Sequence, residues 1–541
     1  MLSALETMGR SVRFSRGVRA FLRAPLDPSA VMGLVDDEHR CRTERFLSML
    51  DRLVWREPTS PWLRFFSLVG AERDDVTRLV TELGLDGALA HLRDLGVYLS
   101  TEEAQGQMPV RRGSTTFTVQ PHELFNHSVR SDFIAGTSGT RSAGTPVAVS
   151  FPALKRMAVN LHLTAEMWDV VDRPTALWRP ALPGSGGIIA LLSSAVAGQE
   201  VERWFSQLDP RDRGIRASKR LANRLLPLVA PSARLPRAVH TPTTDPSAVL
   251  AWCMDALARS DRAALNVYPS SALRLTHAAE AAGARLDGLV LRLVGEPVSS
   301  TKASAIRASG AEPMNAYAFT QQGAVATACP HLPDEELHLF EHEMAVIQRR
   351  RARLDGVAVD ALLWTNVSSS ARSVWINVEN DDYGVVEHDG PACPCVLGTM
   401  GMRTRLSRIR GMSKAVAGGI TMPPSAVDTL VEQVLPSCFG GNPADWQLAE
   451  GADRRTSYLE IRADPRLGPL DEGQVVRTAL DALRVTEAGV LAGSVWSEPG
   501  FIRVVRRSPA PARSGKTLGF EPLRPDVEAS PHDRRSGSPR V

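Results

Sequence analysis

Residues 133–147 read Phe133-Ile-Ala-Gly-Thr-Ser-Gly-Thr-Arg-Ser-Ala-Gly-Thr-Pro-Val147 and place small and hydroxyl residues between two apolar, strand-like runs. The glycines allow the backbone to turn several N–H groups toward one point, and the hydroxyls add further donors, which suits polyphosphate oxygens. The loop is not of the Walker A type, since no Gly-Lys-Ser/Thr follows. By composition alone, an ordinary Ser/Gly surface loop also fits. The candidate phosphate-binding residues are Thr137, Ser138, Gly139 and Thr140.

The sequence around this loop alternates strand-like and helical runs from about residue 110 to 300, as in Met157–Val170 (helix), Ala248–Leu257 (helix) and Leu289–Val294 (strand). Such alternation predicts an α/β fold with a helix-covered sheet. Apolar spacing over Val76–Leu92 predicts a helix within a helical segment. A β-rich subdomain follows, with strands expected at Leu337–Ile347 and Val374–Val378. After it we expect a helix over Ser425–Leu435 and further short strands.

These patterns divide the chain of 541 residues into a large α/β domain and a small α+β domain, with a boundary near 408–414. The predicted parts are a helical segment of the large domain (1–105), the core (106–410), the small domain (411–520) and a disordered tail rich in Pro, Ser, Asp and Arg (521–541).

The composition excludes several classes of protein. Hydrophobic residues make up 43% and charged residues 23%, as in soluble globular proteins. A net charge of +3 argues against a general nucleic-acid binder. The longest apolar run, Gly186–Gly198, is shorter than the roughly 20 residues of a membrane span. Met1–Pro25 carries five arginines but no apolar signal-peptide core. We therefore expect a cytoplasmic protein without a membrane span or nucleic-acid partner.

The order of residues in the loop adds a resemblance. Thr137-Ser-Gly-Thr-(Arg-Ser)-Ala-Gly-Thr-Pro146 is similar to the Thr-Ser-Gly-Ser/Thr-Thr-Gly-x-Pro signature of the adenylate-forming enzymes, with roughly one extra residue and without the Lys that often follows the Pro. The phenylacetate-CoA ligase family is the branch that it most resembles. Four more segments match the family's motifs in the same order, namely Val294-Gly-Glu-Pro297, Asn315-Ala-Tyr-Ala-Phe-Thr-Gln321, Asp382-Tyr-Gly384 at an expected strand end, and Arg513-Ser-Gly-Lys516.

The resemblance implies an enzyme that joins a carboxylic acid to the α-phosphate of ATP and passes the acyl group to a thiol. It implies that Lys516 bridges the acid and the α-phosphate, that Thr320 donates to this phosphate, and that Asp382 holds the ribose. The adenine would lie between Tyr317 and the turn Gly295-Glu296-Pro297. From the residues alone, Lys516 could be a solvated tail lysine and Asp382 a turn-forming residue.

The resemblance also implies an acyl pocket, favours an aryl or otherwise hydrophobic acid, and implies a mobile small domain that turns about a hinge. Lys414 is at the hinge position, although it could equally be a surface lysine. Gln321 replaces the glutamate that binds Mg²⁺, and Met412 replaces an arginine, so the position of the metal is open. The expected acyl-pocket residues are Tyr268, Pro269, Asn315, Ala316 and Ala318.

Four residues form a candidate metal site. The chain has six cysteines, and Cys393-Pro-Cys395 and Cys329 are accompanied by histidines. Thiolates together with an imidazole suit tetrahedral zinc. The spacing resembles a structural zinc site of some phenylacetate-CoA-ligase-like proteins, with Cys329, His338, Cys393 and Cys395 as ligands. His331 is the alternative imidazole, unligated buried thiols are the alternative to a metal, and His342 could be an ordinary surface residue.

Two classes of function follow. The first is an acyl- or aryl-CoA ligase that uses ATP, Mg²⁺ and coenzyme A, with a carrier-protein phosphopantetheine arm as the alternative acceptor. The second is a nucleotide-binding module that has lost catalysis, which Gln321 and Met412 motivate. The resemblance leaves open whether the chain forms a homodimer.

Overall fold

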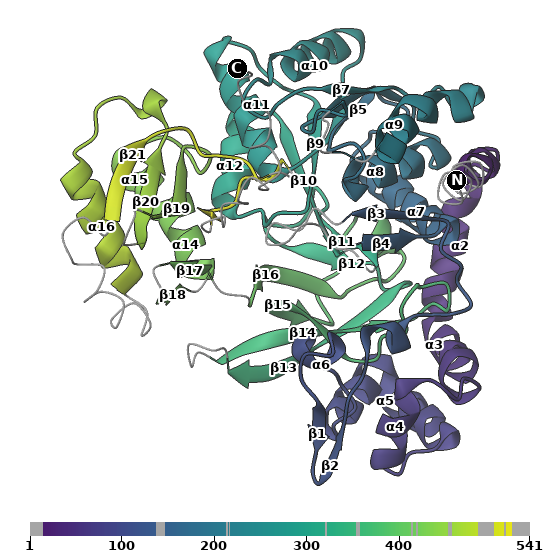
Figure 1. Cartoon of the computed structure of the whole chain (residues 1–541). Helices are drawn as coiled ribbons and strands as arrows, with labels where there is room; N and C mark the ends of the chain where they lie inside the picture. The colour runs from purple at the N-terminus through teal and green to yellow at the C-terminus, as the bar shows by residue number, and fades with distance from the viewer. Residues whose placement is uncertain are drawn as a thin grey trace, which may run out of the picture. The chain divides into compact units, whose positions relative to one another are not determined.

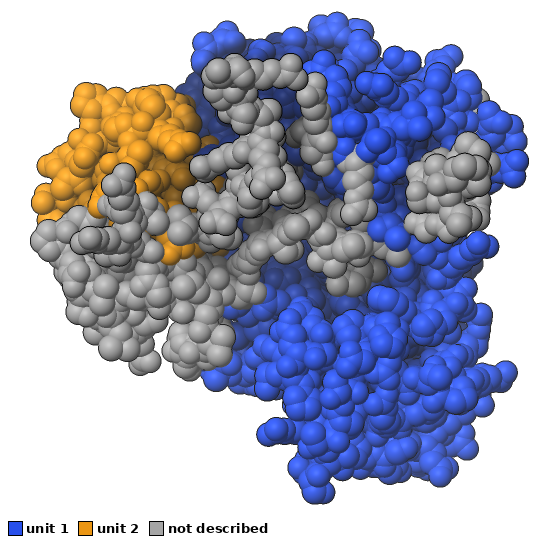
Figure 2. All heavy atoms as spheres, viewed as in Figure 1, with its two compact units in different colours: residues 1–413, 442–444, 510–518 blue, residues 414–441, 445–509, 519–541 orange. Residues whose placement is uncertain are grey.

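The computed structural model divides the chain into two units, coloured separately in Figure 2. The first comprises Met1–Ser413, Asn442–Ala444 and Ala510–Leu518, and the second comprises Lys414–Gly441, Asp445–Pro509 and Gly519–Val541. The residues that the structure describes are 14–136, 146–211, 215, 217–319, 322–352, 358–412, 415–417, 420–422, 424–452, 457–484, 502–512 and 515–521. The predicted mixed α/β class is confirmed.

A 12-stranded sheet forms the framework of the first unit (Figure 1). Its strand order, among the described residues, is β13-β14-β15-β16-β12-β11-β10-β9-β8-β5-β6-β7. The strands from β10 to β7 in this order are parallel, and those from β13 to β11, together with the β11–β10 pair, are antiparallel. The bounds are β5 (Thr175–Trp178), β6 (Val201–Ser206), β7 (Ala238–His240), β8 (Ala263–Val267), β9 (Leu289–Val294), β10 (Glu312–Phe319), β11 (Gly323–Thr327), β12 (Leu337–Leu339), β13 (Met344–Ala352), β14 (Ala358–Asn366), β15 (Val378–Glu387) and β16 (Arg405–Gly411).

The parallel half is covered by helices on both faces, which explains why its strands are nearly continuous apolar runs. One face packs on α7 (Phe151–Met167) and α8 (Ser185–Val196). The other packs on α10 (Ser247–Arg259), α11 (Pro269–Ala281) and α12 (Ser300–Ala308). The predicted strand 289–294 and helix 248–257 are confirmed. The predicted helix 157–170 begins earlier than expected because the Ser150 side chain caps α7.

The antiparallel half packs on helices from the N-terminal part of the chain. These are α3 (Arg42–Leu50), α4 (Pro61–Leu68) and α5 (Arg73–Asp94), with α2 (Pro28–Arg40) preceding them. The predicted helix 76–92 lies inside α5, which is kinked at Gly84 because this residue has a φ of 70°. The expected single strand 337–347 is wrong, since a turn after Leu339 separates β12 from β13. The strand expected at 374–378 begins only at Val378.

The glycine-rich loop is flanked by two short strands, as the apolar runs predicted. β3 (Phe133–Gly136) pairs antiparallel with β4 (Pro146–Val149). The remaining elements of the first unit are α6 (Thr101–Ala104), β1 (Val110–Arg112), β2 (Thr115–Phe117), α9 (Ala217–Val229), α13 (Val396–Thr399), a π-helical turn at Asp51–Trp55 and 3₁₀ turns at Pro121–Leu124 and Pro231–Ala233.

The second unit has its own core beneath a four-stranded sheet in the order β21-β20-β19-β22. The strands are β19 (Trp446–Ala452), β20 (Ser457–Ala463), β21 (Ile502–Arg506) and β22 (Phe520–Glu521), and β17 (Ala415–Ala417) pairs with β18 (Ile420–Met422). The helix expected at 425–435 is present as α14 (Pro424–Thr429), a π-helical turn (Leu430–Val434) and α15 (Leu435–Phe439); a 3₁₀ turn (Pro465–Leu467) and α16 (Glu472–Arg484) follow. In the described part of the chain, no helix is both long and apolar enough to cross a membrane.

The buried face of β8 should dominate the stability of the parallel half. We expect Leu265→Ala to lower the free energy of unfolding by about 2–5 kcal/mol, because Leu265 is 0% exposed and the substitution leaves a cavity. Leu83→Ala is the matched control, since Leu83 is 52% exposed, and should change it by no more than about 0.5 kcal/mol. Chemical denaturation of both variants measures the difference, and equal losses would contradict the assigned packing.

Candidate functional site

The carboxyl ends of four parallel strands meet at one edge of the sheet, where open α/β sheets bind ligands. Arg179 follows β5, Gln207 follows β6, Tyr268 follows β8, and the turn Gly295-Glu-Pro297 follows β9. Val294 is the last residue of β9 and residues 295–297 follow it directly, so the expected buried strand before this motif is confirmed. This edge therefore gathers polar and aromatic side chains from segments that are far apart in sequence.

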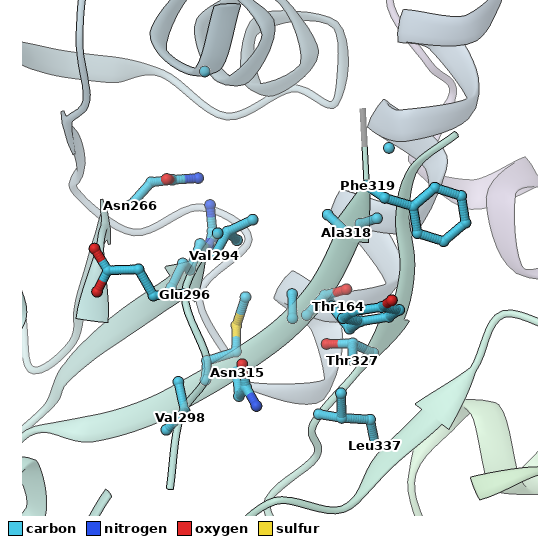
Figure 3. A pocket seen from close by; sticks show the side chains of 18 of the residues that line it. Thr164, Asn266, Val294, Glu296, Val298, Asn315, Ala318, Phe319, Thr327 and Leu337 are labelled. Atoms are coloured by element: carbon cyan, nitrogen blue, oxygen red, sulfur yellow. The ribbon is translucent and has the colours of Figure 1, made fainter. Parts of the chain in front are cut away.

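A cavity of about 430 Å³ opens at this edge and extends between the sheet and helices α7 and α8. The predicted pocket residues Asn315, Ala316 and Ala318 line it, and Figure 3 shows Asn315 and Ala318 along β10 with Glu296 on the neighbouring segment. Tyr268 and Pro269 are not among the lining residues, contrary to expectation. Tyr268 is instead fully buried, because its ring is packed against charged side chains.

Lys516 lies at this edge, within the first unit. Its Nζ is 5.4 Å from the centre of the Tyr268 ring, and a Cβ placed on Gly295 would come within 3.3 Å of this Nζ atom. Gly295 also has a φ of 95°, so only glycine fits this turn without strain. Burial lowers the pKa of Lys516 to about 8; the Glu296 carboxylate opposes this shift and Arg179 adds to it. Lys516 is thus an ammonium in a poorly solvated position that lines the cavity.

Ser270 holds the Lys516 segment in place. Its hydroxyl oxygen accepts a hydrogen bond from the Thr517 N–H at 3.0 Å, and its N–H and Oγ lie 2.9 Å from the two oxygens of Glu296. Burial raises the pKa of Glu296, whereas Lys302, Ser270 and Lys516 act in the opposite direction. The carboxylate of Glu296 is engaged at the N-terminus of α11, and the contact of this turn with adenine stays a prediction. Ala510–Leu518 consequently belongs to the first unit, although the sequence pattern grouped it with the small domain.

Arg179 is a site residue that the sequence analysis missed. Its guanidinium lies 4.0 Å from the centre of the Tyr268 ring, and Nη1 donates to the Val294 carbonyl oxygen at 2.9 Å. Its Nε is buried without a hydrogen-bond partner, and the side chain lines the cavity. In a chain with 63 basic residues, of which only five are lysines, a single arginine carries no signal. The one feature that could have pointed to Arg179 is its position directly after strand β5, at the edge of the sheet where ligands bind.

Tyr317 and Asp382 meet on neighbouring parts of the cavity wall. The Tyr317 hydroxyl donates to the Asp382 carboxylate, and the Asn380 amide donates to the Tyr317 oxygen at 2.7 Å. Burial raises the pKa of Asp382 to about 7, and burial followed by the Asp382 charge raises the pKa of Tyr317. Asp382 is not at a strand end as expected, because β15 continues to Glu387 across a register shift.

Several predicted residues lie outside the described part of the chain. These are Thr137, Ser138, Gly139 and Thr140 of the loop, Thr320, the Mg²⁺-site residue Gln321 and the hinge residue Lys414. Their roles stay predictions. Met412 is described, and its N–H donates to the Asp381 carbonyl oxygen at 2.7 Å.

The four predicted zinc ligands come together in the first unit. The donor atoms of Cys329, His338, Cys393 and Cys395 all lie within 4.8 Å of one another and are buried. The Cys329 and Cys393 sulfurs are 3.6 Å apart, and the Cys395 sulfur is 3.4 Å from His338 Nε2. A tetrahedral zinc with Zn–S bonds of about 2.3 Å separates two sulfurs by roughly 3.8 Å, so this donor set fits the ion.

The other two histidines take no part in this cluster. His331 is exposed, and the imidazole in the cluster is that of His338. The alternative that His342 is an ordinary surface residue is wrong, because the residue is fully buried and its Nε2 lies 3.0 Å from Asn160 Oδ1. The turn after Leu339 removes His342 from the strand face that it would have shared with His338.

Comparison with known proteins gives similarity at the level of structure only. The chain matches no protein-family model and no curated protein. It is similar to a 2-hydroxyisobutyryl-CoA ligase in complex with an acyl-AMP (15% identity, covering 90% of this chain and 89% of the other, TM-score 0.48). It is also similar to an anthranilate CoA ligase with anthranoyl-AMP (13%, 71% and 65%, TM-score 0.39) and to an o-succinylbenzoate CoA synthetase from Bacillus subtilis (13%, 72% and 68%, TM-score 0.34). Because these TM-scores are under 0.5, we base the function on the residues and their geometry.

The raised pKa of Asp382 makes stability depend on pH. The folded pKa of about 7 exceeds the unfolded value of about 3.9, so the folded state retains the proton more strongly and stability decreases as pH rises from about 4 to about 7. We expect Asp382→Asn, which cannot ionise, to become progressively more stable relative to the unsubstituted protein over this window. Chemical denaturation between about pH 4 and pH 8 measures this difference, and parallel pH profiles would contradict the pKa shift.

Proposed function

We propose that the protein activates a carboxylic acid with ATP and transfers the acyl group to a thiol. In the first step a carboxylate oxygen attacks the α-phosphorus of ATP and the bond to pyrophosphate breaks, which gives acyl-AMP. In the second step a thiol sulfur attacks the acyl carbon and AMP leaves. Both reactants of the first step are anions, so positioning and positive charge carry most of the catalysis.

The observation that supports this proposal best is the position of Lys516 beside Arg179 at the mouth of the cavity. Lys516 and Arg179 are both close to the Tyr268 ring, and both side chains line the cavity. Lys516 would bridge the reacting carboxylate and the α-phosphate, and Arg179 would offset the remaining phosphate charge. Two cations that repel each other at a partly buried site are stabilised when an anion binds between them.

The nucleotide would lie along the same edge. Asp382, held by Tyr317 and Asn380, presents a carboxylate that can accept hydrogen bonds from the ribose hydroxyls. The turn at Gly295–Pro297 and the Tyr317 ring would contact the adenine. Thr320 and the loop from Thr137 to Thr140 would donate to the phosphates, and Mg²⁺ would accompany the triphosphate. Lys414 would be the hinge about which a mobile small domain turns between the two steps.

Coenzyme A is the proposed thiol, and a carrier-protein phosphopantetheine arm is the alternative. Product analysis with coenzyme A and with a holo carrier protein distinguishes them. Pyrophosphate exchange with a panel of acids tests activity itself. ATP binding without exchange for any acid would favour the second candidate, a nucleotide-binding module without catalysis.

The role of Lys516 can be tested by substitution. We expect Lys516→Ala to slow adenylation by roughly 10²–10³-fold, because a donor to the transition state is lost, while ATP binding measured by calorimetry changes little. Since the pKa of Lys516 is about 8, kcat/KM for adenylation should fall as pH rises through this value. Lys516→Arg should move that decline to higher pH.

The matched control is Lys155→Ala, which removes an exposed lysine on α7 and should leave the rate unchanged. Unchanged adenylation in Lys516→Ala would remove the role assigned to this residue.

We also propose that Cys329, His338, Cys393 and Cys395 bind a structural zinc ion. The ion would cross-link two cysteines near β15 and β16 to the segments after β11 and at β12, and it would supply no step of the reaction. Because the cluster packs in one core with Val31, Val35 and Phe340, its loss should loosen α2 as well.

The zinc site predicts about one equivalent of zinc in the purified protein by metal analysis. Cys393→Ser and Cys395→Ser should each lose the metal and lower the unfolding temperature. Cys41→Ser, which changes an exposed thiol, should retain the metal and leave the unfolding temperature unchanged. A zinc content well below one equivalent in the unsubstituted protein would disprove the site.

A further inference from the structure

Two polar residues interrupt the buried parallel strands beside the cavity. β8 reads Ala-Ala-Leu-Asn-Val and β9 reads Leu-Val-Leu-Arg-Leu-Val, so Asn266 and Arg292 are the exceptions in otherwise apolar runs. The two residues are direct partners in the register of the two strands. Since partners in a sheet project to the same face, Asn266 and Arg292 lie on one side of it. Both line the cavity that opens at Lys516.

The Arg292 guanidinium is deeply buried, and no carboxylate of the described residues pairs with it. The residue is 1% exposed, and Nη1 donates to Gln199 Oε1 at 2.7 Å. Its Nε and Nη2 are buried without a hydrogen-bond partner. Burial lowers its pKa to about 10, and no neighbouring charge contributes to the shift. An uncompensated buried cation is costly, so this position calls for an anion.

Other partly buried arginines of the first unit are paired in the expected way. Arg349 is 2.6 Å from the Glu379 carboxylate, which is itself fully buried. Arg156 is 2.5 Å from Glu38 and also contacts Glu343. These two guanidinium groups are compensated by carboxylates, whereas no carboxylate among the described residues pairs with Arg292 at the wall of the cavity.

Two further buried polar atoms without a partner among the described residues belong to side chains that line the same cavity. Asn266 Oδ1 and Ser193 Oγ are both buried without a partner, and both residues line the cavity. A carboxylate bound at Arg292 would accept from Nε and Nη2, and the Ser193 hydroxyl can donate a further hydrogen bond to it, whereas the unpartnered Asn266 Oδ1 is an acceptor and would pair with a donor group of the ligand. Donors of this kind select a ligand strongly, because a ligand without the matching group leaves them unpaired.

We propose that Arg292 binds a second carboxylate of the acid substrate, so that the enzyme activates a dicarboxylic acid. This inference rests on the proposed ligase function, in which the other carboxylate reacts beside Lys516. Arg292 on β9 is three residues before Gly295 of the turn that follows the strand, which corresponds to about 10 Å of extended chain. The cavity would thus bind an acid with anionic groups at both ends, in place of the aryl or hydrophobic acid that the family resemblance favoured.

Pyrophosphate exchange with matched acids tests this inference. The panel pairs dicarboxylic acids of increasing chain length with the monocarboxylic acids of the same length. We expect kcat/KM to be roughly 10²-fold or more higher for the best dicarboxylic acid than for its monocarboxylic partner. Arg292→Met should abolish this preference and raise activity with the monocarboxylic partner, whereas Arg292→Lys should retain part of the preference.

Arg203→Met is the matched control, because Arg203 is an exposed arginine on β6 of the same sheet and should leave the preference unchanged. Arg292→Met replaces an unpaired buried charge by an apolar side chain, so it should fold at least as well as the unsubstituted protein. Exchange that is equally efficient with both acids of each pair, or an unchanged preference in Arg292→Met, would overturn the inference and leave the ligase function standing.

Thermal unfolding with each acid separates a failure of the inference from a failure of the ligase function. A ligand that binds the folded state raises the unfolding temperature whether or not chemistry follows. An increase with the dicarboxylic acids that Arg292→Met loses, without exchange for any acid, would support the anion site and refute the ligase. No exchange and no increase would overturn both.

Discussion

The site depends on one buried carboxylate, that of Glu296, whose charge must be stabilised by hydrogen bonds and nearby positive charge. Glu296 is at the carboxyl end of β9, where it is taken out of water, and it accepts hydrogen bonds from the backbone and the hydroxyl of Ser270. The same serine accepts from Thr517, and Lys516 supplies part of the opposing charge. Ser270, which satisfies the Glu296 carboxylate, therefore also attaches the segment that carries Lys516 to the end of the parallel strands.

Charge is distributed unevenly along the cavity, and this distribution links the two proposals. At one end, Lys516 and Arg179 both lie close to the ring of Tyr268, where phosphate and a reacting carboxylate would be neutralised. Further back along β9, Arg292 has no anionic partner in the part of the chain that the structure describes. The lining also includes apolar residues, with Met314 beside Arg292 and Ala316 beside Val294 in the register of β9 and β10. An acid with charge at both ends and an apolar middle matches this arrangement.

The periodicity of the sequence predicted the elements whose burial is uniform. Leu289–Val294 is apolar except at Arg292 because it is buried on both faces, and its bounds agree with the structure. The prediction failed where a local turn interrupts an apolar run, as after Leu339, because periodicity does not record where backbone hydrogen bonds change partners. It failed in the same way for Asp382, where a register shift occurs inside β15 rather than at its end.

The residues of the candidate site likewise fall into those that the sequence could predict and those that only the structure revealed. The order of the motifs along the chain led to the prediction of Lys516, Tyr317 and Asp382, through the family resemblance. The cysteines and histidines stood out because cysteine and histidine are rare in this chain. The burial of Arg179 and Arg292 and the withdrawal of Tyr268 from the cavity wall were decided only by the tertiary structure. An arginine is equally compatible with a solvated surface and with an unpaired buried position, and only the packing of distant strands and helices around it determines which of the two it occupies.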